Sequence, residues 1–184
     1  MRRSIWIWIA LLAASCASRS LADGPRIVED PLAGPGVVVL IFVRTDCPIS
    51  NRYAPTIREL AAEHGARGVR FVMVYADLDA TPETIARHQR EFDLPPWVLR
   101  DPEHAWVART GVSVTPEVAV FDAAHRLSYR GRIDDRFPMP GVARDEARVH
   151  DLDLALEALE RGETPAVSSR PAIGCPIPAL VGSR

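Results

Sequence analysis

Two apolar runs, VVVLIFV at residues 37–43 and VRFVMVYA at residues 69–76, constrain the fold of this chain more than any other feature. Each has the length and the β-branched content of a strand that is buried on both faces of a sheet. Between them, apolar residues recur at helical spacing from Arg52 to His64, and Gly65 supplies a stop. Strand, helix and strand in this order predict a parallel βαβ unit whose first strand is central in its sheet.

The next segments predict two further helices. Thr81 is suited to cap a helix over residues 81–92, because Pro82 then takes the first helical position, where its missing N–H is not needed. A short run, WVLRD, and a helix around residues 103–110 follow.

The last third of the chain predicts that the sheet is mixed. The runs EVAVF and RLSYRG read as strands, and the short link DAAH between them makes them an antiparallel hairpin. An amphipathic helix carrying Leu152, Leu156 and Leu159 comes next and ends at Gly162. The sequence therefore predicts an α/β fold with a mixed central sheet flanked by helices.

The first 24 residues, MRRSIWIWIALLAASCASRSLADG, have the layout of a secretory signal. Two arginines precede an apolar run over residues 5–14, and small residues lead to a cleavage site after Ala22. We therefore expect a periplasmic or secreted protein. Cys16 offers a lipoprotein alternative, which Ala13 disfavours because the lipid-attachment box prefers a larger aliphatic residue there.

The rest of the chain predicts a single domain and no membrane span. We expect a signal peptide at 1–22, one domain at 23–162, and a tail rich in proline and serine at 163–184. No segment of the mature chain approaches the ~20 apolar residues that a transmembrane helix needs. The formal net charge of −2 becomes about −5 when the signal leaves with its three arginines, so no nucleic-acid partner is expected. Nothing in the sequence specifies an oligomeric state.

Cys47 is the first candidate for chemistry. It directly follows a predicted buried strand and precedes Pro48, so its sulfur is expected at the N-terminus of a helix. In that position, free backbone N–H groups favour the thiolate and lower the pKa from ~8.5. A thiolate is the nucleophile that attacks disulfides and peroxides. The alternative is that Cys47 acts only as a small buried hydrophobic residue.

Pro116 is the second candidate. It stands in VTP, immediately before the strand EVAVF, and proline suits the start of a strand because it cannot donate to the ladder. A cis bond there would let the preceding backbone turn sharply. The alternative is an ordinary strand-initiating proline.

Together these elements resemble a known fold. The order strand, Cys-Pro, helix, strand, helix, Thr-Pro, hairpin and helix resembles the thioredoxin fold over most of residues 37–161. More narrowly, the segments DCPISNRYAP, VTPEVAVFD, YRGRIDD and PAIGCPI resemble the peroxiredoxin-like redoxins of the alkyl hydroperoxide reductase and thiol-specific antioxidant group. This resemblance implies that the Pro116 loop lies against Cys47 and that the backbone of Thr115 pairs with a substrate peptide.

Two positions depart from the patterns of these families. Ser50 stands where thioredoxin-type reductants carry the second cysteine of CxxC, so the usual four-residue disulfide cannot form. Arg44 stands three residues before Cys47, where true peroxiredoxins carry a threonine that hydrogen-bonds the peroxide.

Cys175 is the candidate for a second sulfur in the mature chain. It lies in the tail, in a second Cys-Pro-Ile, and could act as a resolving thiol that attacks a mixed disulfide or a sulfenic acid at Cys47. A static structural disulfide and an unpaired exposed thiol are the alternatives, because the sequence does not give the Cα separation of roughly 4.4–6.8 Å that bridging requires.

These features predict an exported thiol-disulfide oxidoreductase that acts on protein thiols or disulfides. Cys47 would be the nucleophile, Pro116 would shape the partner groove, and Cys175 would release the partner. One alternative is a thiol peroxidase with antioxidant activity on a peroxide substrate, and another is a copper-handling or redox-inert binding module. The five histidines show no ligand spacing with either cysteine and no CxxCH is present, so we expect no metal or cofactor site.

Overall fold

A computed structural model describes residues 24–180 of the 184-residue chain. The expected signal segment, with its cleavage site after Ala22 and the alternative lipid site at Cys16, lies outside the described residues.

The described chain forms nine strands and five helices. The strands are β1 (Arg26–Ile27), β2 (Val38–Val43), β3 (Arg70–Tyr75), β4 (Trp97–Arg100), β5 (Val114–Thr115), β6 (Glu117–Phe121), β7 (Leu127–Gly131), β8 (Ser169–Arg170) and β9 (Cys175–Pro176). The helices are α1 (Pro48–Arg52), α2 (Ala54–Gly65), α3 (Pro82–Phe92), α4 (Ala105–Thr110) and α5 (Asp151–Glu160).

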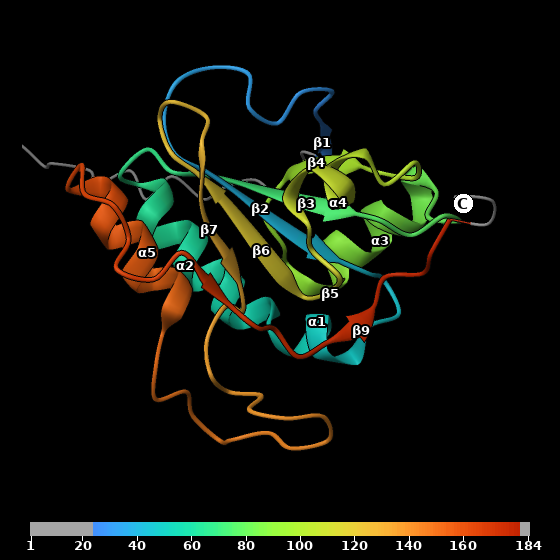
Figure 1. Cartoon of the computed structure of the whole chain (residues 1–184). Helices are drawn as coiled ribbons and strands as arrows, with labels where there is room; N and C mark the ends of the chain where they lie inside the picture. The colour runs from blue at the N-terminus through green and yellow to red at the C-terminus, as the bar shows by residue number, and fades with distance from the viewer. Residues whose placement is uncertain (1–23, 181–184) are drawn as a thin grey trace, which may run out of the picture.

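The main sheet is mixed and has the strand order β1-β4-β3-β2-β6-β7-β8 (Figure 1). Strand β2 is at its centre, parallel to β3 on one side and antiparallel to β6 on the other. The β2–α2–β3 unit and the β6–β7 hairpin are both as the sequence predicts. A second, two-stranded sheet joins β5 to β9, which lie about sixty residues apart in the sequence.

The central strands are buried on both faces because helices or loops cover each side. Every residue of β2 is at most 1% exposed. Since side chains alternate along a strand, Val39 and Ile41 enter one core and Val38 and Leu40 the other. Uninterrupted apolar composition is what such a strand requires.

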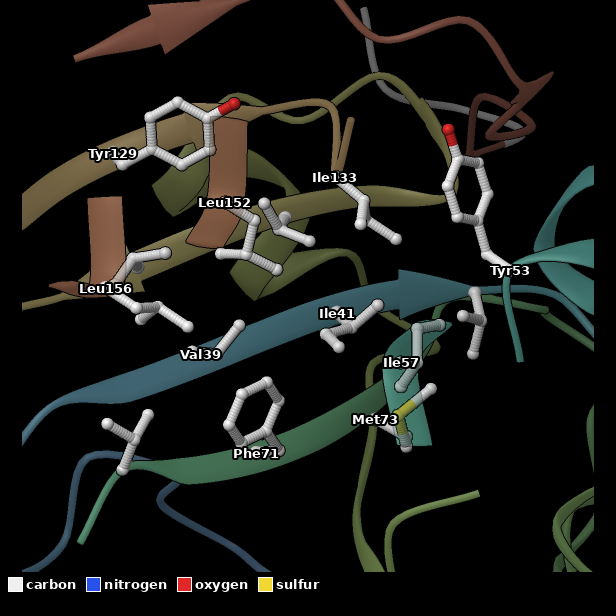
Figure 2. Packing of buried hydrophobic residues seen from close by; sticks show 14 of the residues in the cluster. Val39, Ile41, Tyr53, Ile57, Phe71, Met73, Tyr129, Ile133, Leu152 and Leu156 are labelled. Carbon is white, nitrogen blue, oxygen red and sulfur yellow. The ribbon is translucent and has the colours of Figure 1, made fainter. Parts of the chain in front are cut away.

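Helices α2, α3 and α5 cover one face of the sheet, and α4 with the chain around Leu32 covers the other. On the first face, Ile57 of α2 and Leu156 of α5 pack over Ile41 and its neighbours on β2 and β3 (Figure 2). This arrangement fixes the carboxyl end of β2, from which Cys47 follows.

One element differs from the sequence prediction of a single helix over Arg52–His64. The structure has two helices, α1 and α2, with a break at Tyr53. Pro55 explains the break, because it lacks the N–H that a continuous helix would donate to the carbonyl of Asn51. The break turns the Tyr53 side chain into the core, where its hydroxyl donates to Asp134 at 2.5 Å.

The two-residue strands β1, β5, β8 and β9 have no alternating pattern from which the sequence could predict them. They form by pairing with distant segments, and β8 and β9 bring the tail back onto the molecule. None of the helices within residues 24–180 is long and apolar enough to span a membrane.

Helix α5 offers a matched test of the core. Leu156 is fully buried, whereas Leu154 in the same helix is 57% exposed. We predict that Leu156→Ala lowers the free energy of unfolding by about 2–5 kcal/mol, because it removes buried methyl groups and leaves a cavity. Leu154→Ala should change it by less than about 0.5 kcal/mol. Urea titrations of both variants measure this difference, and equal losses would contradict the packing described.

Candidate active site

Cys47 lies where β2 ends and α1 begins, and it is the N-cap residue of α1. Its backbone is extended, with φ −83° and ψ 110°, and Pro48 takes the first helical position. The sulfur accepts a hydrogen bond from the backbone N–H of Ser50 at 3.4 Å. Cys47 is only 1% exposed, so the sulfur is almost completely covered in this state.

The loop before β6 contacts the Cys47 sulfur. The Thr115–Pro116 bond is cis, which is one of the two alternatives that the sequence left open. Thr115 is fully buried. The Cys47 thiol donates to the carbonyl oxygen of Thr115 at 3.1 Å. Pro116 and Cys47 are therefore brought together from segments nearly seventy residues apart.

The tail reaches the same point through β9. Cys175 is the register partner of Thr115 in the antiparallel β5–β9 pair, and Ile177 N–H donates to the carbonyl of Ser113 at 3.0 Å. Figure 1 shows β9, in red, beside β5 and α1. Both cysteines are free thiols, and they meet at Thr115, which pairs with Cys175 and whose carbonyl accepts from the Cys47 thiol.

The pKa values of the two thiols are shifted in opposite directions. Burial alone raises the pKa of Cys47, but hydrogen bonds from Cys175, Ser50 and Thr115 outweigh it and hold that pKa below its usual value. Burial, together with the hydrogen bond and the charge of Cys47, raises the pKa of Cys175 to about 11. The surroundings therefore make Cys47 the more acidic of the two thiols and keep Cys175 neutral.

Ser50 supports the thiolate even though it cannot replace the missing cysteine. It is buried, and its hydroxyl has no hydrogen-bond partner among the described residues. A hydroxyl can rotate to donate to a sulfur that becomes charged. The side chain of Ser50 accordingly contributes to the lowered pKa of Cys47.

Arg44 connects the loop before Cys47 to the tail, a role the sequence did not indicate. Its guanidinium donates to Asp77 at 2.9 Å, to Asp46 at 3.0 Å and to the carbonyl of Pro176 in β9 at 3.2 Å. Asp77 also accepts from the backbone N–H of Thr45 at 3.1 Å. The sequence pattern identifies Arg44 only as a departure from the peroxiredoxins, because the position of the tail depends on the whole fold.

A buried polar chain supports the other side of the Cys47 loop. His88 donates from Nε2 to the amide oxygen of Asn51 at 2.9 Å, and its Nδ1 accepts from Tyr75 at 2.8 Å. This tautomer follows because the amide oxygen can only accept. The Asn51 amide in turn donates to the carbonyl of Thr45 at 3.5 Å. Burial lowers the pKa of His88, which keeps the ring neutral.

Within the part of the chain that the structure describes, no three or more His, Cys, Asp or Glu side chains are grouped so that they could hold a metal ion. The chemistry that this arrangement offers is that of two adjacent thiols.

The fold resembles solved structures over most of the chain. An uncharacterised conserved protein from Geobacillus kaustophilus is 25% identical, with a TM-score of 0.70 over 81% of this chain and 80% of that one. A hypothetical protein from Sinorhizobium meliloti is 22% identical, with a TM-score of 0.69 over 80% and 82%. A thioredoxin family protein from Chlorobium tepidum, described as a thiol:disulfide interchange protein, is 15% identical, with a TM-score of 0.50 over 68% and 80%.

The family assignment comes from the sequence profile. No curated protein matches this chain. The Redoxin family matches residues 28–145, which include Cys47 and Pro116 but stop before Cys175. The chain therefore belongs to the Redoxin family and has the thioredoxin-like α/β fold that the order of its motifs predicts.

Proposed function

We propose that this protein is an exported thiol-disulfide oxidoreductase in which Cys47 is the nucleophile and Cys175 the resolving thiol. The observation that carries this proposal is that two free thiols meet at Thr115, whose carbonyl accepts from the Cys47 thiol and which pairs with Cys175 of β9. In this proposal, residues 1–22 direct export, residues 23–162 form the redoxin domain, and the tail at 163–184 supplies the second sulfur. The partners are proteins that carry thiols or disulfides.

The first step is attack of the Cys47 thiolate on a partner disulfide. A bond forms between Cys47 and one partner sulfur, and the other partner sulfur leaves as a thiolate. The lowered pKa of Cys47 increases the fraction of the attacking thiolate at a given pH.

The second step is release of the partner by Cys175. Its sulfur attacks Cys47, its proton passes to solvent or to the departing thiolate, and the partner leaves fully reduced while a Cys47–Cys175 disulfide forms. The charge and the hydrogen bonding of Cys47 contribute to the high pKa of Cys175. Both are lost once Cys47 is in a mixed disulfide, so the first step itself makes Cys175 easier to deprotonate.

Ser50 makes the tail necessary in this scheme. A serine cannot close the short disulfide of a CxxC motif, so a mixed disulfide at Cys47 has no other resolving sulfur within the described residues. Pro116 acts by positioning, since its loop places the Thr115 carbonyl against Cys47.

Substitution of each cysteine tests the assigned roles. We predict that Cys47→Ser lowers insulin-disulfide reduction to the rate of buffer alone, because the nucleophile is lost. Cys175→Ser should instead form a mixed disulfide at Cys47 that persists, which mass spectrometry of the intact protein detects. Circular dichroism controls for folding.

Two outcomes would contradict these roles. Insulin reduction that is unchanged in Cys47→Ser would remove Cys47 as the nucleophile. Oxidation of Cys47 by hydrogen peroxide much faster than that of free cysteine, without any exchange with insulin, would indicate the thiol peroxidase alternative.

The pH dependence of Cys47 alkylation tests the hydrogen bond between the thiols. Only the thiolate reacts, so we predict a rate midpoint below the ~8.5 of an ordinary cysteine. Cys175→Ala removes a donor that favours the charged form, so the midpoint should rise, whereas Cys175→Ser keeps a hydroxyl donor and should shift it less. Iodoacetamide labelling resolved to the Cys47 peptide measures the midpoints. The same midpoint in wild type and Cys175→Ala would disprove the hydrogen bond's role.

A further inference from the structure

The closed site presents a problem for the proposed chemistry, because Cys47 is 1% exposed and cannot meet a partner disulfide as it stands. The cover on this site includes β9, since Cys175 in that strand pairs with Thr115, whose carbonyl accepts from the Cys47 thiol at 3.1 Å. Some part of this cover must move before exchange can begin.

Strand β9 is a short part of this cover. It has only two residues, and Ile173 and Ile177 on either side of it pack against the two cores of the domain. Ile177 N–H donates to Ser113, Arg44 donates to the Pro176 carbonyl at 3.2 Å, and the Thr115 hydroxyl approaches the Cys175 carbonyl at 3.5 Å. Pro176 is itself exposed and lacks an N–H to donate.

The preceding part of the tail is anchored separately. Strand β8 is parallel to β7, with Arg130 N–H donating to Ser168 at 3.0 Å and Arg132 N–H donating to Arg170 at 3.2 Å. The Arg170 guanidinium also lies 3.5 Å from Asp151 of α5. Strand β9 can therefore leave β5 while β8 keeps the tail attached to the main sheet.

Departure of β9 would expose a strand edge beside the reactive sulfur. The backbone groups of Ser113 and Thr115 that now face β9 would lose their partners, and an unpaired edge pairs readily with another extended chain. The carbonyl of Thr115 lies 3.1 Å from Cys47, so a chain paired there would hold its own disulfide against the thiolate.

We propose that β9 is an internal competitor for the partner's strand. The tail occupies the β5 edge in the resting protein, and a partner gains access to Cys47 by supplying an extended, disulfide-bearing segment that replaces it. This inference rests on the proposed function. Resolution then returns β9 to β5, because the Cys47–Cys175 bond tethers the tail to the edge and expels the partner.

Gly174 shows how closely β9 must approach. A Cβ added there would collide with the carbonyl oxygen of Thr115, so alanine at this position would force β9 away from β5. Gly65 provides a matched control, because its backbone needs no positive φ and a Cβ added there meets nothing within 4 Å.

The first test compares access to Cys47 in a Cys175→Ser background, using a decapeptide disulfide as the probe. We predict that adding Gly174→Ala speeds attack of Cys47 on this probe by about tenfold or more, because the departure of β9 from β5 limits access to the sulfur. Gly65→Ala should leave the rate unchanged. Equal rates in all three proteins would overturn the competitor role.

The second test does not depend on the glycine variant. In the trapped mixed disulfide of Cys175→Ser with the peptide, the amide of Ile177 should lose its protection from hydrogen exchange while the amides of β2 keep theirs. Protection of Ile177 that is retained in a mixed disulfide would overturn the competitor role and leave the exchange chemistry standing. Failure of Cys47 to form any mixed disulfide would overturn the proposed function itself.

Discussion

The pairing of β9 with β5 is the contact on which the whole site depends. It brings Cys175 to Thr115, whose carbonyl already contacts the Cys47 thiol. The two cysteines lie 128 residues apart in the sequence, and Ser50 stands where a nearer second thiol would be. The sheet also positions this contact, because the buried strand β2 leads directly to the start of α1 and so fixes the place of Cys47.

The same contact divides the chemical roles of the two sulfurs. A donor beside Cys47 favours its thiolate, and a thiolate beside Cys175 keeps that thiol protonated. The two effects are reciprocal, and they end together when Cys47 is bonded to a partner. The pair of thiols alone then ensures that Cys47 binds the partner before Cys175 releases it, without an additional catalytic group. Arg44 holds the β9 backbone by a cationic donor, so the tail is positioned by its main chain and Cys175 remains free to react.

Sequence reasoning predicted the parts of the site that depend on local patterns. The apolar composition of residues 37–43 and 69–76 is enough to predict two buried strands. Cys47 follows the first of these strands and Pro116 precedes another, and short motifs at strand ends are informative. The β5–β9 pair could not be predicted, since two-residue strands have no periodicity and their register depends on the whole fold. The split between α1 and α2 had a visible cue in Pro55, which interrupts the helical hydrogen bonds.

The most direct test of the account is the disulfide state of the protein equilibrated with glutathione redox buffers, determined by thiol counting and peptide mass spectrometry. The account predicts a single intramolecular Cys47–Cys175 disulfide that forms and opens in one two-electron transition. A protein in which Cys47 bonds only to glutathione or to a second chain, while Cys175 stays free, would contradict it.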